Sequence, residues 1–290
     1  MSSLREIFSR DPPRLAGASC GEVLAVLGSL PEATTVDRAL TFGASSDRLA
    51  WAFVAGYVAA CQRLFPGADV AACLLVSERG ASGPRDVTTR LHDGKLRGTK
   101  TFVTMGTLAR ELYVLATEGS AADGRARLRV ARVARDAPGV TVEDSPPIAF
   151  LPEVPHGIAR FDDAAAEILP GDGWIDYVRP FRAIEDLHVM VAVLAFLAAA
   201  RVRGGLSEGA LIPPLLALRA LGDEALEEVV VQVSLAHALR AAARAIESIQ
   251  GEIVPESTLR ALTVLRLGAE ARQRREDAAR AQLALPPSTP

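Results

Sequence analysis

The stretch GKLRGTKTFVTMG, from Gly94 to Gly106, is the most informative part of this sequence. Its core, Lys95 to Thr104, is rich in residues that favour a pleated backbone and predicts a β-strand. The preceding residues His92-Asp93-Gly94 predict a hairpin turn, because Asp and Gly tolerate positive φ angles. The strand ends on Thr104-Met105-Gly106, and this small polar cluster needs a reason beyond the sheet itself.

Similar short runs fill the chain on both sides of this strand, between about residues 70 and 169. They often alternate between apolar and polar residues and are bounded by Gly, Pro or Asp, which is typical of β-strands. The runs are VAACLLV, VTTRL, ELYVLAT, RARLRVARVA and GIARF. A second turn, Ala122-Asp123-Gly124, separates two of them, so the segment is expected to be all-β with two hairpins.

Helical patterns enclose the β-segment. Before it, apolar residues recur at helical spacing from Leu49 to Leu64, and Pro66-Gly67 ends the pattern, whereas PEATTVDRALTFGASSD is turn-rich and loosely patterned. After it, three helices are expected, at about 183–203, 223–250 and 256–284. The sequence therefore predicts an α+β fold. Its expected parts are an N-terminal helical segment (1–67), a central β-barrel-like domain (68–172) and a C-terminal helical bundle (173–290).

Composition excludes several classes of protein. Hydrophobic residues make up 49% and charged residues 23% of the chain, and the net charge of −3 carries no basic excess for nucleic acid. The longest apolar run, Val189 to Ala200, is shorter than the roughly 20 residues that span a bilayer and predicts a buried helix. Cys20, Cys61 and Cys73 lack paired metal spacing, and no apolar signal core begins the chain. A cytoplasmic protein without nucleic acid or membrane partners is expected.

Several linked motifs resemble those of the acyl-CoA dehydrogenase family. In order, they are LLVSERGASGPRD, GKLRGTKTFVTMG, ELYVLAT, PGVTVE and GIARFDDAAAEILPGDGW. They correspond to a strand that ends in Ser or Thr followed by Glu, a Gly-rich loop, the strand G.K.(W/F)(I/V)T.G, and a strand with F(D/E)(D/N) that leads into the bundle. The resemblance covers roughly residues 68–200, and it implies an FAD-dependent oxidoreductase that acts on the CH-CH group of an acyl thioester.

The resemblance also explains the strand end. By position, Phe102 would pack near the flavin ring and Thr104 would hydrogen-bond its polar edge, while Met105 replaces the usual Asn of the family. Val76 and Ser77 would offer a backbone group and a hydroxyl to the other flavin edge. Gly80, Ala81, Ser82 and Gly83 would form the loop near the cofactor and the acyl thioester. A flat apolar ring needs a flat wall and a few placed donors, which this set supplies.

The candidate base is Glu185, in the segment EDLHVMVAVLA. One branch of the family carries its base near the start of the first bundle helix, and an alignment with one inserted residue puts Glu185 there; without the insertion Ile184 takes the position. Asp186 stands where the family has Arg, and would raise the pKa of Glu185 by like-charge repulsion. Alternatively, Glu185 and Asp186 cap the first helical turn. Glu185 and His188 also form Glu-x-x-His, but no second such pair completes a metal site.

The sequence departs from the family in ways that leave two functions open. It lacks the Q.FG segment that helps to hold FAD across a subunit interface and the late YEG-type carboxylate segment. The charged helix LRLGAEARQRREDAARAQL is expected to form a solvated or partner-facing surface. The protein is either a shortened enzyme of this type or a non-catalytic relative that acts as a partner subunit or regulator. A homo-oligomer is expected, because a shortened bundle would expose the Leu and Val faces of residues 225–239.

Overall fold

The computed structural model describes residues 15–28, 34–80, 83–120, 124–249, 260, 263, 266 and 269–286. The chain divides into two compact units. The β unit comprises Cys20–Gly28 and Cys61–Arg182, and the helical unit comprises Met1–Ser19, Ser29–Ala60 and Ala183–Pro290. Two of the boundaries between the units lie inside helices, after Ala60 and after Arg182.

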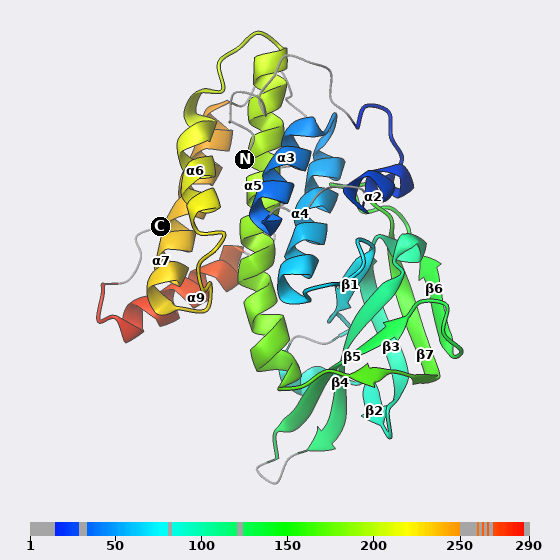
Figure 1. The fold of residues 1–290 in the computed structure, drawn as a ribbon. Helices are drawn as coiled ribbons and strands as arrows, with labels where there is room; N and C mark the ends of the chain where they lie inside the picture. Colours follow the sequence, from blue (N-terminus) through cyan, green and yellow to red (C-terminus); the bar gives the residue numbers. More distant parts are fainter. Residues whose placement is uncertain are drawn as a thin grey trace. The chain divides into compact units, whose positions relative to one another are not determined.

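The β unit is built on one eight-stranded sheet that curls around its own core (Figure 1). The strand order is β6-β7-β3-β2-β4-β5-β8, and β1 pairs with β4 in parallel. The strands are β1 (Ala72–Leu75), β2 (Arg90–His92), β3 (Lys95–Thr104), β4 (Glu111–Ser120), β5 (Ala126–Ala134), β6 (Val140–Asp144), β7 (His156–Ala165) and β8 (Glu167–Ile168). Helix α2 (Cys20–Gly28) and a π-helical turn, Gly173–Val178, belong to the same unit. The expected all-β segment is confirmed.

The first predicted hairpin is confirmed in detail. β2 and β3 pair antiparallel with His92 opposite Lys95, and the two turn residues between them, Asp93 and Gly94, have φ angles of 48° and 72°. Positive φ at both central positions matches the right-handed twist of the strands. β4 and β5 also pair antiparallel as predicted, and their turn residues 121–123 lie outside the described residues.

The helical unit carries more helices than the sequence pattern predicted. Its described helices are α3 (Thr35–Ser45), most of α4 (Leu49–Leu64), most of α5 (Arg179–Arg203), α6 (Ile212–Ala220), α7 (Val229–Ser248) and α9 (Ala269–Gln282). The turn-rich, loosely patterned stretch PEATTVDRALTFGASSD contains a regular helix, α3, for which the sequence pattern made no clear prediction. Thr34 caps it by accepting a hydrogen bond from the Asp37 backbone N–H. The expected helix at 223–250 begins later, at Val229, and α6 was not predicted.

Helices α3 and α4 approach α5 closely through glycines. A Cβ atom on Gly43 of α3 would lie 2.2 Å from the Ala192 carbonyl oxygen, and one on Gly56 of α4 would lie 2.5 Å from the Val189 Cα atom. Neither contact is possible for a real side chain, so glycine is what lets the backbones meet. The predicted buried helix from Val189 to Ala200 is confirmed as the centre of this packing.

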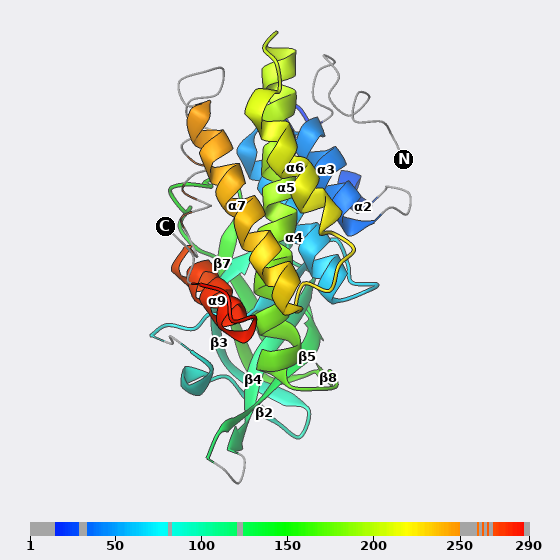
Figure 2. The same cartoon turned by 90° about the vertical axis from the view of Figure 1, so that its left-hand side faces the viewer.

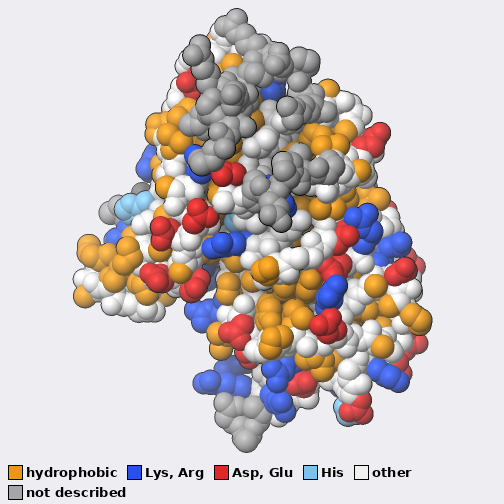
Figure 3. Space-filling model, in the orientation of Figure 1, with side chains coloured by type: hydrophobic (Ala, Val, Ile, Leu, Met, Phe, Trp, Pro, Cys, Tyr) orange, Lys and Arg blue, Asp and Glu red, His pale blue; other side chains and the backbone are white. Residues whose placement is uncertain are grey.

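Two described helical stretches are long and apolar enough to cross a membrane by length and composition, Gly173–Arg203 and Val229–Ser248. In the first, 83% of the most apolar window is buried inside the protein, as in the core helix of a folded domain; in the second the share is 39%. On the face of the molecule in Figure 3, acidic and basic side chains are interspersed. The α+β arrangement of N-terminal helices, central sheet and C-terminal helices is confirmed.

The close helix contact predicts a stability effect. Gly56→Ala should lower the free energy of unfolding by about 1–3 kcal/mol, because the new methyl group overpacks the contact with α5. Gly21→Ala is the matched control: it also lies in a helix, nothing lies within 4 Å of its Cβ position, and the free energy of unfolding should stay or rise by up to about 1 kcal/mol. Urea denaturation measures both, and equal effects would contradict the packing explanation.

Candidate functional site

A buried ion pair lies beneath the predicted cofactor residues. The Lys100 Nζ atom is 2.6 Å from Glu78 Oε1, and the two side chains are 0% and 3% exposed. Lys100 points inward because it continues the face of β3 that holds Leu96 and Gly98. Burying one such charge without a partner would be strongly unfavourable, so the two residues require each other.

The same ion pair joins three segments of the β unit. Glu78 follows β1, and its Oε2 accepts hydrogen bonds from the Thr88 backbone N–H at 2.7 Å and from the Thr88 hydroxyl at 2.5 Å. Its Oε1 also accepts from the Thr89 backbone N–H at 3.1 Å, and Lys100 Nζ donates to the Val76 carbonyl at 3.3 Å. The end of β1, the chain before β2 and the middle of β3 are therefore held together.

The protonation of this pair follows from its contacts. Burial alone would raise the pKa of Glu78, but the hydrogen bonds from Lys100 and Thr88 outweigh it and lower the pKa from 4.5 to about 2. Burial lowers the pKa of Lys100 from its ordinary value of 10.5, and the contact with Glu78 opposes that shift. Because the folded pKa of Glu78 is depressed, its stabilising contribution is present above about pH 4.5 and is lost as the pH falls toward 2.

The end of β3 is shaped by a β-bulge that turns Phe102 outward. The pairing of β3 with β7 shifts register between Lys100 and Val103, and Phe102 has φ of 55° and is 67% exposed. A bulge re-aims a side chain, and a left-handed φ costs a bulky residue roughly 1–2 kcal/mol. A large aromatic side chain that is exposed on a strained backbone indicates a surface that binds something else.

The other predicted cofactor residues lie around this strand end. The Thr101 backbone N–H donates to the Ser77 carbonyl at 2.8 Å, which places the ends of β1 and β3 side by side. Val76 and Thr104 are half-buried and Ser77 is exposed. The structure thus brings Val76, Ser77, Phe102 and Thr104 to one region of the β unit.

The Thr-Met-Gly end of the strand is a turn. Met105 is buried with φ of 70°, and Gly106 with φ of 52° starts a short 3₁₀ helix, Gly106–Leu108. Asp144 of β6 fixes this turn, since its carboxylate accepts from the Thr107 backbone N–H at 2.7 Å and from the Thr107 hydroxyl at 3.0 Å. The strand end is consequently rigid rather than frayed.

The Gly-rich loop is only partly described. Gly80 has φ of 80°, and the Gly83 backbone N–H donates to Asp86 Oδ2 at 3.0 Å, at the start of a 3₁₀ helix, Pro84–Asp86. The predicted loop residues Ala81 and Ser82 lie outside the described residues. Gly83 is therefore placed next to the segment that the Glu78 carboxylate holds.

Glu185, the predicted base, lies in the helical unit and not at a helix start. Helix α5 begins at Arg179, so Glu185 and Asp186 sit in its second turn and the capping alternative is wrong. Asp186 is paired with Arg272 at 2.7 Å and with Arg275, both from α9. The expected repulsion between Asp186 and Glu185 is therefore opposed by two guanidinium groups, and no pattern in the sequence indicated this pairing.

The histidine of the Glu-x-x-His pattern is a satisfied core residue. His188 is fully buried; its Nδ1 lies 2.7 Å from the Ile184 carbonyl and its Nε2 lies 2.8 Å from the Thr35 hydroxyl. Only a protonated Nδ1 can donate to the carbonyl, so Nε2 accepts from Thr35 in the neutral ring. Among the described residues, no group of three or more His, Cys, Asp or Glu side chains could hold a metal ion.

Sequence reasoning missed Lys100 as a site residue. Its signal was present: a Lys at an inward-facing position of a strand, with Glu78 at the end of a neighbouring run. Gly98 was also missed. A Cβ there would lie 2.7 Å from the Thr89 Cα atom, and its φ of 150° is one that side chains rarely adopt, so glycine is needed for the close approach of the Thr88–Thr89 segment to β3.

Comparison with solved structures identifies the fold. An FAD-dependent dehydrogenase superposes with a TM-score of 0.59 at 16% sequence identity, covering 86% of this chain and 78% of that one. The butyryl-CoA dehydrogenase of Megasphaera elsdenii gives 0.58 at 14% identity, covering 89% and 88%. An acyl-CoA dehydrogenase of Geobacillus kaustophilus gives 0.54 at 16% identity, covering 93% and 87%. No family model and no curated protein matches the sequence. The chain has the acyl-CoA dehydrogenase fold.

The buried pair predicts a large effect of a single charge removal. Glu78→Gln should lower the free energy of unfolding at pH 7 by about 3–5 kcal/mol, because it leaves the Lys100 ammonium buried without its counter-ion. The control is Asp163→Asn, which breaks the exposed pair with Arg97 at 2.8 Å and should change the free energy of unfolding far less, because solvent screens this pair. Urea denaturation measures both. The double change Glu78→Gln with Lys100→Met should recover most of the loss, and equal instability of single and double variants would contradict the pairing.

Proposed function

We propose that the protein is an FAD-dependent acyl-CoA dehydrogenase-like oxidoreductase that acts on the CH-CH group of an acyl thioester. The observation that carries the proposal is Phe102, exposed on a strained bulge beside Ser77 and Thr104, in a chain with the acyl-CoA dehydrogenase fold. An aromatic wall beside two hydroxyl groups suits a planar, partly polar ring.

The residues of the β unit fit the flavin ring of FAD. The Phe102 ring would cover one face or edge of the flavin, and its burial there would offset the strain of its backbone. The hydroxyls of Thr104 and Ser77 would hydrogen-bond the polar edges, and Val76 would add apolar contact. FAD, when bound, supplies the acceptor for the hydride that leaves the β-carbon of the substrate.

Glu185 is the proposed base for the α-proton of the thioester. A carboxylate suits this step because its oxygen can accept the α-proton in the transition state and release it afterwards. Asp186 does not share the task, since Arg272 and Arg275 hold its carboxylate. The acyl chain and the electron acceptor are left open by these residues.

The cellular setting belongs to the same proposal: a cytoplasmic enzyme of fatty acid metabolism that works as a homo-oligomer. The sequence predicted exposed apolar faces at residues 225–239 as the reason for an oligomer, and this is wrong for Val231, Leu235 and Leu239, which are buried within the chain. Val230, at 60% exposure, remains a surface residue. Oligomer formation stays a prediction that light scattering at micromolar concentration would decide.

The cofactor assignment predicts graded losses of FAD affinity. Thr104→Ala should weaken binding by about 0.5–1.5 kcal/mol, the usual value of one hydrogen bond, and Phe102→Ala should weaken it further through the lost aromatic wall. Thr99→Ala, the same substitution at an exposed position of the same strand, is the control and should bind as the wild type does. Titration of FAD into the apoprotein measures all four proteins. If the wild type and both site variants bind FAD with equal affinity, the flavin ring does not bind at this strand end.

The reaction assignment predicts which carboxylate the chemistry needs. Anaerobic addition of a panel of acyl-CoAs to the FAD-loaded protein should bleach the flavin, and Glu185→Gln should slow bleaching by roughly 10²–10⁴-fold, the usual contribution of a general base. Glu247→Gln, at an exposed position of α7, should bleach at the wild-type rate. Fast bleaching by Glu185→Gln would place the base elsewhere. If no acyl-CoA bleaches the wild type, the non-catalytic relative becomes the better description.

A further inference from the structure

Helix α9 turns a charged face toward the rest of the helical unit. Its side chains that are not fully exposed are Ala271, Arg272, Arg275, Glu276, Ala279 and Arg280. They recur at three- and four-residue spacing and so share one face, yet all but the two alanines are ionised. A helix that docks through the hydrophobic effect has an apolar inward face. The sequence predicted a solvated or partner-facing surface for this helix, whereas this face bonds to α7 and α5 of the same chain.

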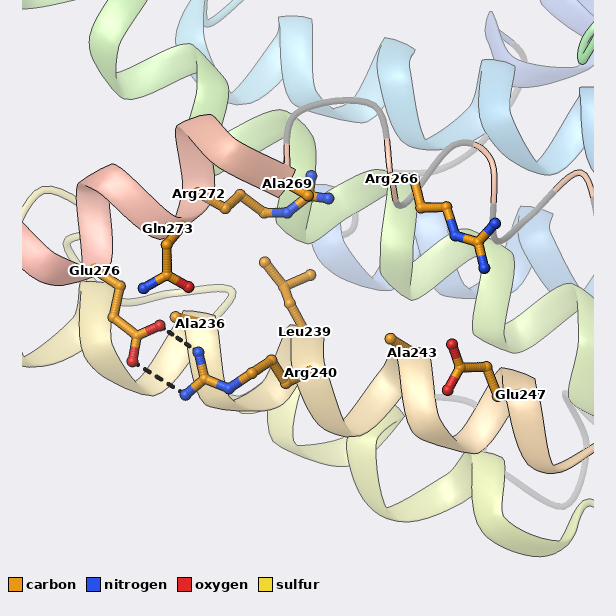
Figure 4. Close-up of a pocket in the computed structure, with 10 residues that line it drawn as sticks. All are labelled: Ala236, Leu239, Arg240, Ala243, Glu247, Arg266, Ala269, Arg272, Gln273 and Glu276. Atoms are coloured by element: carbon orange, nitrogen blue, oxygen red, sulfur yellow. Dashed lines mark hydrogen bonds and ion pairs between the residues drawn. The ribbon is translucent and has the colours of Figure 1, made fainter. Parts of the chain in front are cut away.

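The first anchor of α9 is the carboxylate of Glu276, whose side chain is 1% exposed. Its Oε1 accepts hydrogen bonds from Arg240 Nη2 of α7 at 3.0 Å and from Arg280 Nε at 2.8 Å, and Arg240 Nη1 bonds its Oε2. Arg280 Nη2 also donates to His237 Nε2 of α7 at 2.7 Å. Figure 4 shows the Arg240 guanidinium facing the Glu276 carboxylate.

The second anchor is Asp186 of α5. Its Oδ1 accepts from Arg272 Nη1 at 2.7 Å, and its Oδ2 bonds Arg275 Nη2. The side chains of these three residues are only 16–24% exposed. α9 therefore contributes a carboxylate to α7 and two guanidinium groups to α5.

Apolar contact between α7 and α9 is sparse. Helix α9 lies across α7 (Figures 1 and 2), and a cavity of about 230 Å³ opens between the two helices (Figure 4). Its apolar lining is Ala236, Leu239, Ala243 and Ala269. Within the described part of α9, the only buried side chains are Glu276 and Ala279.

We propose that these two ion-pair clusters dock α9 on α5 and α7, and that α9 can leave them while the rest of the helical unit stays folded. The desolvation of charged groups cancels much of their attraction, so such docking is weaker than apolar packing. Segments with few buried apolar contacts open locally before the whole protein unfolds. When α9 leaves, Asp186 loses both guanidinium partners and becomes an unpaired negative charge beside Glu185. The inference does not depend on the proposed function.

Hydrogen–deuterium exchange of the full chain, followed by mass spectrometry, tests this docking. Glu276→Gln should lower the protection of amides in 269–282 at least tenfold and leave peptides from the sheet and from α5 unchanged. Asp186→Asn should act in the same way. Glu270→Gln is the matched control, because it removes an exposed i,i+4 pair with Arg274 on the same helix, and protection should not change.

Three results would overturn the proposal. Unchanged protection of α9 in both Glu276→Gln and Asp186→Asn would mean that other contacts hold the helix. An equal loss across α5 and α7 would make α9 an integral part of the unit rather than a detachable one. A comparable loss of amide protection in Glu270→Gln would mean that any change of charge on α9 destabilises the helix itself, without a specific role for the two ion-pair clusters.

Discussion

The buried ion pair between Glu78 and Lys100 is the constraint on which the β unit depends. A charge without water needs a partner at close range, so the carboxylate and the ammonium must meet wherever the rest of the chain lies. Their meeting fixes the end of β1 against the middle of β3. The Glu78 carboxylate also accepts hydrogen bonds from the backbone N–H and hydroxyl of Thr88 and from the backbone N–H of Thr89. These bonds fix the segment that follows the Gly-rich loop. Three separate segments of the β unit are thereby held in one rigid arrangement.

That arrangement explains how the end of β3 can hold an unfavourable backbone. Phe102 and Met105 both have left-handed φ angles, and such conformations persist only where the surrounding structure over-determines them. Lys100 anchors the strand before the bulge, and Asp144 fixes the turn after it through Thr107. The chain between these two anchors presents Phe102 to the outside. Rigid support on both sides is what a binding surface for a planar ring requires.

The two units use ion pairs in opposite ways. In the β unit one buried pair, with side chains 0% and 3% exposed, links segments of the sheet. In the helical unit, arginines that are 12–30% exposed surround Glu276 and Asp186, and they join a helix that buries almost no apolar surface. Charged groups lose hydration in both units, but only the Glu78–Lys100 pair is surrounded by the hydrophobic core of its unit. In the β unit the ion pair therefore stabilises the core of the sheet, and in the helical unit the ion pairs hold one helix against its neighbours.

Local sequence patterns were sufficient to predict the β-segment, its first hairpin, where Asp93 and Gly94 accept positive φ, and the apolar helix around Val189 to Ala200. Motif order along the chain also predicted the α+β fold, because spacing between strands is a property of sequence. It missed α3, since close packing against α5 through Gly43 overrides the weak helical pattern. Only the folded chain shows that Phe102 turns outward, that Lys100 is buried, and that Asp186 pairs with Arg272 and Arg275. Each of these depends on contacts between residues far apart in the chain, and no local pattern encodes which charge will find which partner.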